Sequence, residues 1–599
     1  MRHSVLRYVC FFLPAVLLVV GCPLAGAAAE LGVPADYPTI SAAVQAAGPG
    51  DVIRIAAGEY AENVAIDKDL SIIGHSAATT IIKGTAEYAV TVSGRVLLEH
   101  LTVTGPETGI QVDKASELTV RNCRIVDCPS DGIGFESSTK TVLRLYDSEI
   151  LRNGDGIDLE GTQGIIADCE LSNNRDDGLD YDGNAGVLTF RNHIANNRDD
   201  GIEIRLATTT LAIICRNVIE GNGEDGIEFI DSPRPDPTHN IVAISENVIR
   251  NCDRFGVGCV DQETEEAAEG QVKATIYWGV NDIVGCAKGA VSPNYVAQGR
   301  QDLGLPRAVS VSTGASGAAK RLPLRHALLL GIIDMKPNIS GESAGDLEGI
   351  AVDAEHIYVA DDVQRRIQIV STKTGRLEGG IPTKPFPGSD LLCDGPEGLS
   401  FVGPPGARRL LLADDATGNL FHLSLQRENL GHVESREAWG EVLHMPEGVE
   451  YVDGTLFFAF DGRKLAAADP KTKRLLDGFA PAYVFEGFGR HVAGVGWDGE
   501  RLLLTAAAYA GEKVHSGRSL VFAADRDTGE VLGIWSVGAF ASDPRGIAAW
   551  GGLAYVVDGM SHYTDAETGW LNAEGEKVFI IWLAEGDPPR EVLERLPIR

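Results

Sequence analysis

Short apolar runs that alternate with polar residues recur along the first half of the chain, and turns rich in Gly, Asp and Asn separate them. Alternation with a period of two predicts β-strands that bury one face. One turn returns five times as Asp-Gly followed by Ile or Leu, with glycines 24, 22, 23 and 25 residues apart: Gly132, Gly156, Gly178, Gly201 and Gly226. Such a period matches one coil of a parallel β-solenoid, so we predict a stack of coils here.

The coils, aligned on these glycines, share columns of side chains. The residue after each glycine and the residue two further on are apolar, as Ile202 and Ile204 are, which predicts two inward-facing columns. Asn recurs in two other columns, one of which includes Asn174 and Asn197. Stacked amides bond to one another along a ladder, so we interpret these columns as structural.

Acidic residues occupy the outward positions beside the inner columns. Neighbouring coils lie about 4.8 Å apart, which predicts two rows of these side chains on one sheet face. One row contains Asp158, Asp180, Glu203 and Glu228; the next contains Glu136, Glu160, Asp182 and Arg205; the adjoining turns add the pairs Asp176-Asp177, Asp199-Asp200 and Glu224-Asp225.

Three interpretations of the acidic rows stay open. Carboxylates this close raise one another's pKa unless a cation neutralises them, which favours Ca²⁺ held by Asp177, Asp180, Asp200 and Glu203. The spacing between coils also suits the acid and base of a glycosidase. The third interpretation is a solvated face whose Asp-Gly pairs only form turns.

Each functional interpretation has its own candidate residues. The candidate catalytic residues are Asp158, Asp180, Glu203 and Arg205, with the carboxylates holding a cation or moving protons and Arg205 acting as base or uronate clamp. The candidate ligand-binding residues are Glu136, Glu160, Asp182 and Glu228.

A second period begins after a stretch rich in Ser, Gly and Ala at residues 310–320, which is typical of a linker. Glycines then recur 49, 50, 46 and 52 residues apart, each at the start of a short strand: Gly349, Gly398, Gly448, Gly494 and Gly546. Repeats of 40–50 residues with about four strands predict propeller blades. Five blades are evident, and residues 326–334 with neighbouring strands supply a degenerate sixth.

Residues 33–40, 50–55 and 70–74 resemble the amino-terminal entry of the pectin lyase-like superfamily, which includes pectate lyases, pectin methylesterases and many right-handed β-helix proteins. The resemblance covers about residues 31–300 and implies a right-handed parallel β-helix. In the lyases of this superfamily, a calcium-bound uronate loses a proton to an Arg or Lys on the acidic sheet. Arg205 is the only base in the two outward rows, and no lyase signature surrounds it.

Residues 347–353, with 357–361 and 366–369, resemble an NHL-type propeller repeat, and residues 396–399 and 446–449 resemble blade openings of the same broad group, which includes gluconolactonase-like propellers. The fold class that we expect is therefore all-β: a right-handed parallel β-helix over residues 30–300, a linker over 301–325 and a five- or six-bladed β-propeller over 326–599.

Glu348, Glu397 and Glu447 precede equivalent glycines of the second period, so we expect them to converge at one mouth of the propeller channel. Gluconolactonase-like propellers use such a glutamate as a metal ligand, and the resemblance implies a divalent cation here. Ala493 and Arg545 interrupt the set, and a turn-forming role for the glutamates is the alternative.

The amino-terminal residues 1–29 predict an export signal: basic residues at the start, an apolar run over 8–20 and small residues up to Ala29. Residues 19–22 resemble a bacterial lipobox that would make Cys22 the lipidated residue, whereas the alanines at 27–29 suit ordinary signal cleavage; both remain open. We expect a secreted, periplasmic or lipid-anchored protein. No later stretch has the roughly 18 apolar residues of a membrane span.

Charge narrows the choice of partner. The chain has 52 Lys and Arg against 85 Asp and Glu, a net charge of −33, which disfavours nucleic acid and anionic membranes. The eight cysteines after Cys22 contain no CxxC pair and show no disulfide framework, so most are expected to be small buried side chains.

Together these observations predict an exported protein that binds glycan or divalent cations, such as a polysaccharide or another cell-surface component, through the acidic β-helix face, with the propeller as a second interaction platform. A polysaccharide-active enzyme (lyase, hydrolase or epimerase) and a non-catalytic structural protein are the alternatives.

Overall fold

The computed structural model describes residues 28–598, apart from 139, 208, 232–239, 262–273, 293–304, 314–318, 336–344, 405, 440–445, 461–463, 478, 480, 490, 511–512, 515, 560–563 and 566–575. Residues 1–27, which include most of the predicted signal and Cys22, lie outside this range. No helix in the part that the structure describes is both long enough and apolar enough to cross a membrane.

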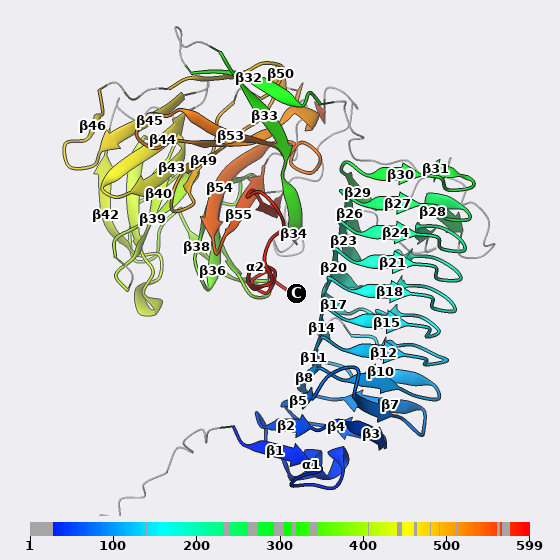
Figure 1. Cartoon of the computed structure of the whole chain (residues 1–599). Coiled ribbons are helices and arrows are strands. Elements are labelled where there is room, and N and C mark those ends of the chain that lie inside the picture. Colours follow the sequence, from blue (N-terminus) through cyan, green and yellow to red (C-terminus); the bar gives the residue numbers. More distant parts are fainter. Residues whose placement is uncertain are drawn as a thin grey trace, which may run out of the picture.

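The first half of the chain is a parallel β-helix in which successive coils add strands to three sheets, named here sheets A, B and C (Figure 1). Sheet A contains β1 (Glu30–Val33), β2 (Val52–Ile55), β5 (Leu70–Gly74), β8 (Arg95–Glu99), β11 (Glu117–Arg121), β14 (Val142–Tyr146), β17 (Gln163–Ala167), β20 (Gly186–Phe190), β23 (Leu211–Cys215), β26 (Ile241–Ser245) and β29 (Thr275–Trp278).

Sheets B and C have ten strands each. Sheet B contains β3 (Gly58–Ala61), β6 (Thr80–Lys83), β9 (Thr102–Thr104), β12 (Arg124–Val126), β15 (Glu149–Leu151), β18 (Glu170–Ser172), β21 (His193–Ala195), β24 (Val218–Glu220), β27 (Val248–Arg250) and β30 (Asp282–Val284). Sheet C contains β4 (Val64–Ile66), β7 (Tyr88–Val92), β10 (Thr108–Val112), β13 (Ile133–Phe135), β16 (Ile157–Asp158), β19 (Leu179–Tyr181), β22 (Ile202–Arg205), β25 (Ile227–Asp231), β28 (Phe255–Asp261) and β31 (Gly289–Val291).

The predicted inner columns and Asn ladder are confirmed. Ile202 and Ile204 are fully buried, as are their counterparts on neighbouring coils. The backbone amide of Asn174 donates to the side chain of Asn197 at 3.1 Å, and the amide of Asn197 donates to Asn222 at 3.1 Å. Helix α1 (Ile40–Ala46) buries Ile40 and packs against β1, β2 and β4, at the start of the stack.

The second half of the described chain forms five sheets around a common axis. Four of them are four-stranded blades: β35 (Leu347–Val352), β36 (His356–Asp361), β37 (Arg366–Ser371) and β38 (Leu377–Pro382); β39 (Pro396–Val402), β40 (Arg409–Asp414), β41 (Asn419–Ser424) and β42 (Val433–Ala438); β43 (Pro446–Val452), β44 (Thr455–Phe460), β45 (Lys464–Asp469) and β46 (Arg474–Leu475); and β34 (Leu328–Asp334), β57 (Lys577–Trp582), β55 (Leu553–Asp558) and β54 (Pro544–Trp550).

The remaining position in the ring belongs to a seven-stranded sheet of β47 (Tyr483–Phe485), β32 (Ala308–Thr313), β33 (Lys320–His326), β53 (Val531–Ser536), β52 (Leu520–Ala524), β49 (Leu502–Ala506) and β48 (Val495–Trp497). Strands β50 (Tyr509–Ala510), β51 (Lys513–Val514) and β56 (Thr564–Asp565) pair with one another in a separate small sheet.

The prediction of five or six blades is therefore corrected to four regular blades. Strand β34, which the sequence suggested as part of a sixth blade, pairs with β57 and so completes the blade formed by the end of the chain. The expected linker over 301–325 contains β32 and β33, which pair with β47 and β53. Extra pairing partners have enlarged one blade into a wider sheet.

The five periodic glycines of this half lie where the inner strands of neighbouring blades approach one another around the axis. A Cβ on any of them would lie between 2.1 and 2.6 Å from the backbone of the next inner strand, in the order Gly349, Gly398, Gly448, Gly494 and Gly546. A Cβ on Gly546 would meet Glu348, beside the first glycine, so the ring closes. Only glycine permits this approach of neighbouring blades.

The propeller lies beside sheet A rather than beyond the end of the stack (Figure 1). One apolar core cluster joins outward residues of sheet A, including Phe190, Ile213 and Tyr277, to propeller residues such as Leu330 and Phe579. Ion pairs surround this core: Arg121 with Glu594 at 2.6 Å, and both Arg191 and Arg216 with Asp587 at 3.2 and 2.5 Å, near the short helix α2 (Arg590–Leu593).

Candidate functional site

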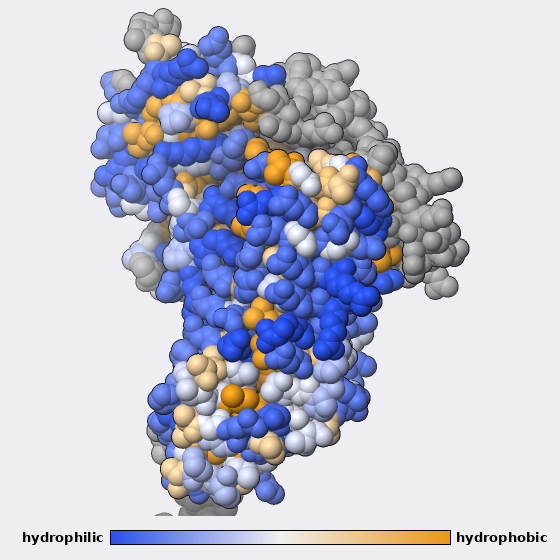
Figure 2. All heavy atoms as spheres, turned by 45° about the vertical axis from the view of Figure 1, so that its right-hand side comes forward, coloured by the Kyte–Doolittle hydropathy of each residue, from blue (hydrophilic) through white to orange (hydrophobic). Residues whose placement is uncertain are grey.

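The predicted acidic row lies on sheet C, on a different face of the solenoid from the propeller contact. Asp158 pairs in register with Asp180, Asp180 with Glu203 and Glu203 with Glu228. Parallel register places one carboxylate above another at each coil. Figure 2, which brings the right-hand side of Figure 1 forward, shows hydrophilic residues over most of this part of the solenoid.

A second column of carboxylates runs inside the turn between sheets B and C. The side chain of Asp155 accepts a hydrogen bond from the amide of Asp177, Asp177 accepts from Asp200, Asp200 from Asp225, and Asp225 from Phe255, at 2.6–2.9 Å. Asp177, Asp200 and Asp225 are at most 5% exposed. The sequence indicated turn formers or ligands at these positions; the structure shows that these residues also form a ladder.

Burial and neighbouring charges both disfavour ionisation in these columns. Burial, followed by repulsion from nearby carboxylates, raises the pKa of Asp158 to about 8, of Asp177 to about 10 and of Asp180 to about 9. Burial raises the pKa of Glu203 to about 7, although Arg205 opposes the shift. The folded chain therefore holds protons here that exposed carboxyl groups would release near pH 4.

Two arginines compensate part of this charge. Arg205 contacts Asp182 at 2.8 Å and Glu203 at 2.9 Å, and Arg254 forms ion pairs with Glu224 and with Glu228, the latter at 3.4 Å. Arg205 carries a raised pKa, to which Asp182 and Glu203 contribute. These contacts favour the role of counter-ion for Arg205 over that of proton acceptor.

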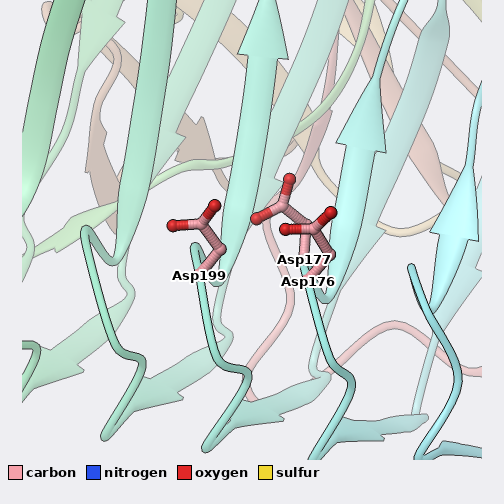
Figure 3. Close-up of side chains that lie close together, drawn as sticks. All are labelled: Asp176, Asp177 and Asp199. Atoms are coloured by element: carbon pink, nitrogen blue, oxygen red, sulfur yellow. The ribbon is translucent and has the colours of Figure 1, made fainter. Parts of the chain in front are cut away.

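Carboxylate oxygens approach one another within 4.8 Å in three overlapping sets: Asp176, Asp177 and Asp199; Asp199, Asp200 and Glu224; and Asp200, Glu203 and Glu228. Figure 3 shows the first set on two adjacent turns. Of the four residues predicted as metal ligands, Asp177, Asp200 and Glu203 belong to these sets, but Asp180 belongs to none of them within the described residues.

The three sets differ in how much positive charge surrounds them. Among the described residues, no Lys or Arg forms an ion pair with Asp176, Asp177 or Asp199, whereas Arg254 or Arg205 is paired with a member of each other set. Asp176 and Asp199 were not among the predicted ligands. The Asp-Asp dipeptide at the turn is the sequence signal that identifies them.

The remaining predicted ligand-binding residues flank the row. Asp182 lies one coil from Glu160, whose pKa is raised by burial and by Asp182 itself, and the amide of Gly161 donates to the carbonyl of Asp182 at 3.0 Å. Glu136 lies farther along the stack, where Lys114 approaches it at 3.9 Å.

The propeller channel holds a separate acidic cluster. Glu348 and Glu397 are buried beside the glycine ring, and Arg545 contacts Glu447 at 3.0 Å and Glu348 at 3.6 Å. His491 also contacts Glu447, at 3.2 Å. The pKa values separate accordingly: burial raises those of Glu348 and Glu397 well above the usual range, whereas His491 and Arg545 lower that of Glu447 against the effect of burial.

Comparison with known proteins supports the fold of the first half. Residues 85–271 match the family model for a right handed beta helix region, so the solenoid is a right-handed β-helix. No curated protein matches this chain significantly.

Solved structures resemble part of the chain. Glutaminyl cyclase from Myxococcus xanthus is 17% identical over 44% of this chain and 98% of its own, with a TM-score of 0.30. Pectate lyase Pel9A is 14% identical over 45% of this chain and 78% of its own, with a TM-score of 0.30. The A-module of mannuronan C-5 epimerase AlgE6 from Azotobacter vinelandii is 14% identical over 43% of this chain and 93% of its own, with a TM-score of 0.28. At these values no activity is transferred.

Proposed function

We propose that the acidic turns of the solenoid bind a divalent cation, Ca²⁺ in the first instance, and that the bound cation and the adjoining row contact a polysaccharide outside the cytoplasm. The observation that carries the proposal is the first carboxylate set: Asp176, Asp177 and Asp199 present oxygens within 4.8 Å of one another, with no ion-paired Lys or Arg in the described part of the chain. Calcium takes oxygen ligands in a flexible geometry.

Electrostatics supports a cation at this position. Burial and the neighbouring acids Glu224 and Asp176 raise the pKa of Asp199 to about 6, and Asp177 holds its proton more tightly still. A divalent cation would replace these protons and remove the repulsion between the carboxylates. The exposed Asp176 leaves the set open to solvent, from which the ion and a ligand can enter.

The test is calorimetric titration of the full-length protein with CaCl₂ after removal of metal ions. We expect binding in the wild type and its loss in the double variant Asp176→Asn/Asp199→Asn. The matched control is Glu149→Gln/Glu170→Gln, which removes two carboxylates that face each other in register on sheet B. Unchanged calcium binding in the Asp176/Asp199 variant would show that the ion lies elsewhere.

A glycan screen in calcium-containing buffer, with detection of products, tests the polysaccharide part. Retention that depends on calcium and on Asp199 supports binding, and cleavage or epimerisation would favour the enzyme alternative. Absence of both would leave the structural alternative.

A second cation position, in the propeller, is favoured by one specific observation. Glu397 is buried beside Glu348, and its Oε2 has no hydrogen-bond partner among the described residues. Buried carboxylates are ordinarily hydrogen-bonded or paired. Glu450, which is half-buried, has such partners: the Ser400 hydroxyl and the amide of Tyr451 donate to its carboxylate at 2.7 and 3.1 Å.

This contrast supplies the control for the propeller. If a cation occupies the channel, Glu397→Gln should reduce the number of divalent ions bound per chain, whereas Glu450→Gln should not. An equal stoichiometry in wild type and Glu397→Gln would remove the propeller from the proposal and leave the solenoid site untouched.

A further inference from the structure

The column that carries the Asn ladder changes composition at the end of the stack. Cys252 follows Asn222 in this column, and Cys286 takes the equivalent position on the next coil, two residues beyond the paired residues Arg250 and Val284. Because no amide follows Asn222, its Nδ2 has no hydrogen-bond partner among the described residues. The ladder therefore gives way to two stacked thiols.

The two cysteines are arranged alike. Cys252 Sγ lies 3.8 Å from the carbonyl oxygen of Arg250, and Cys286 Sγ lies 3.9 Å from that of Val284. The amide of Ala287 donates to the carbonyl of Cys252 at 2.9 Å, which holds the two turns together. Coils about 4.8 Å apart fall within the range of Cα separations that a disulfide bridges, about 4.4–6.8 Å.

No other cysteines in the described chain share a column on neighbouring coils. Asn153 follows Cys128 in the same column, Ser148 follows Cys123, and Asn192 follows Cys169. We propose that Cys252 and Cys286 form a disulfide that fastens the last coil of the solenoid to the coil before it. A single bond of this kind differs from the disulfide framework that the cysteine spacing argues against.

The proposed disulfide would stabilise the terminal coil of the described solenoid. The coil of β29 to β31 is the last in the described stack, and a terminal coil packs against one neighbour only. This coil also carries Tyr277, whose ring meets Phe579 of the propeller at 5.6 Å between centroids. A covalent link here would hold the interface residue in place.

Disulfide exchange supplies the chemistry. The half-buried Cys286 thiolate attacks one sulfur of a small external disulfide such as oxidised glutathione, and one glutathione thiolate leaves. Cys252 then loses its proton, and its sulfur displaces the second glutathione. One S–S bond forms in the protein and one breaks in the reagent; two electrons pass to glutathione, whose two thiols also take up the two protons.

The burial and the raised pKa of Cys252 determine which of the two cysteines reacts first. Cys252 is 1% exposed, and burial together with the neighbouring Cys286 thiol raises its pKa. Cys286 should therefore react first, and closure by Cys252 should be the slower step and should accelerate as pH rises.

The test incubates the full-length protein with oxidised glutathione and maps disulfides by mass spectrometry after digestion without reductant. We expect a peptide pair linked through Cys252 and Cys286, loss of two free thiols and a higher melting temperature that reductant reverses. Cys286→Ser should abolish all three changes. Cys128→Ser, in the same column beside Asn153, should retain them.

The opposite result is equally clear. If Cys286 becomes glutathionylated while Cys252 stays a free thiol, or if both remain thiols in the folded protein, the proposed bond does not form. Neither result bears on cation binding at Asp176 and Asp199.

Discussion

The carboxylate of Asp177 accepts a hydrogen bond from the backbone amide of Asp200 at 2.7 Å. The same contact repeats on three neighbouring coils, so the Asp of four of the five Asp-Gly turns accepts a hydrogen bond from a backbone amide of the next coil. One carboxylate oxygen of each such residue therefore supports the fold, and the proposed ion would bind through the remaining oxygens.

The ladder predicts different effects for two substitutions of Asp200. Asp200→Ala leaves the amide of Asp225 without its acceptor, and an unsatisfied buried donor costs about 1–3 kcal/mol. Asp200→Asn retains an acceptor oxygen and removes a buried acidic group, so its stability should equal or exceed that of the wild type near neutral pH. Denaturant unfolding of the full chain measures both; equal losses in the two variants would contradict the ladder's structural role.

The raised pKa values predict how stability depends on pH. Asp158, Asp180 and Glu228 have folded pKa values of about 8, 9 and 8, mainly because they are buried, whereas unfolded carboxyls titrate near 4. The folded chain then binds more protons than the unfolded chain between these values, so the free energy of unfolding falls as pH rises from about 5 to 9.

We expect calcium to oppose this loss of stability at higher pH. Because the ion competes with protons, its stabilising effect on the melting temperature should be larger at pH 8.5 than at pH 6. Asp180→Asn should flatten the metal-free profile. Melting curves recorded across this range, with calcium and with chelator, decide the point; a melting temperature that rises with pH in chelator would refute the assignment.

The repeats made much of this fold predictable. The spacing of the Asp-Gly turns gave the coil register, and the period near 50 identified the five glycines that meet around the propeller axis. The blade count failed because pairing partners are set by tertiary contacts: β34 resembled a new blade but completes the one that contains β57. The repeat period alone does not show that a strand from one end of the propeller sequence completes the blade formed by the other end.

The sequence did contain a signal for the contact between the two halves: a strand in which consecutive residues are apolar, instead of alternating with polar ones. In β23, Ala212 and Ile214 face the solenoid core, yet Ile213 and Cys215 between them are apolar as well. A strand that is apolar on both faces is buried on both faces. The candidate site was predictable only in part, because the positions of Arg205 and Arg254, which decide which carboxylate set is left uncompensated, depend on side-chain conformation.

The contact between the halves predicts a ranking of substitutions. Tyr277 is 6% exposed in the shared apolar core, and removal of a buried aromatic side chain costs about 3–5 kcal/mol. Asp587 forms two ion pairs, but its side chain is 44% exposed, and exposed pairs contribute about 0–1 kcal/mol. Calorimetry of Tyr277→Ala and Asp587→Ala should show a far larger loss for the first; a larger loss for Asp587→Ala would mean that the ion pairs hold the propeller in place.

The glycine ring predicts that two glycines of one blade differ sharply in tolerance. A Cβ on Gly349, on inner strand β35, would lie 2.1 Å from the carbonyl oxygen of Glu397, so Gly349→Ala forces neighbouring inner strands apart. A Cβ on Gly379, on outer strand β38 of the same blade, would meet no atom within 4 Å, and there alanine should be neutral or stabilise by up to about 1 kcal/mol through the unfolded state. Overpacking costs about 1–3 kcal/mol, so Gly349→Ala should lower the melting temperature while Gly379→Ala should not.

Because Glu397 lies on the strand that Gly349 abuts, Gly349→Ala should also weaken any ion bound in the channel while calcium binding by Asp176 and Asp199 persists. Loss of both ions together would show instead that the propeller and the solenoid unfold as one unit.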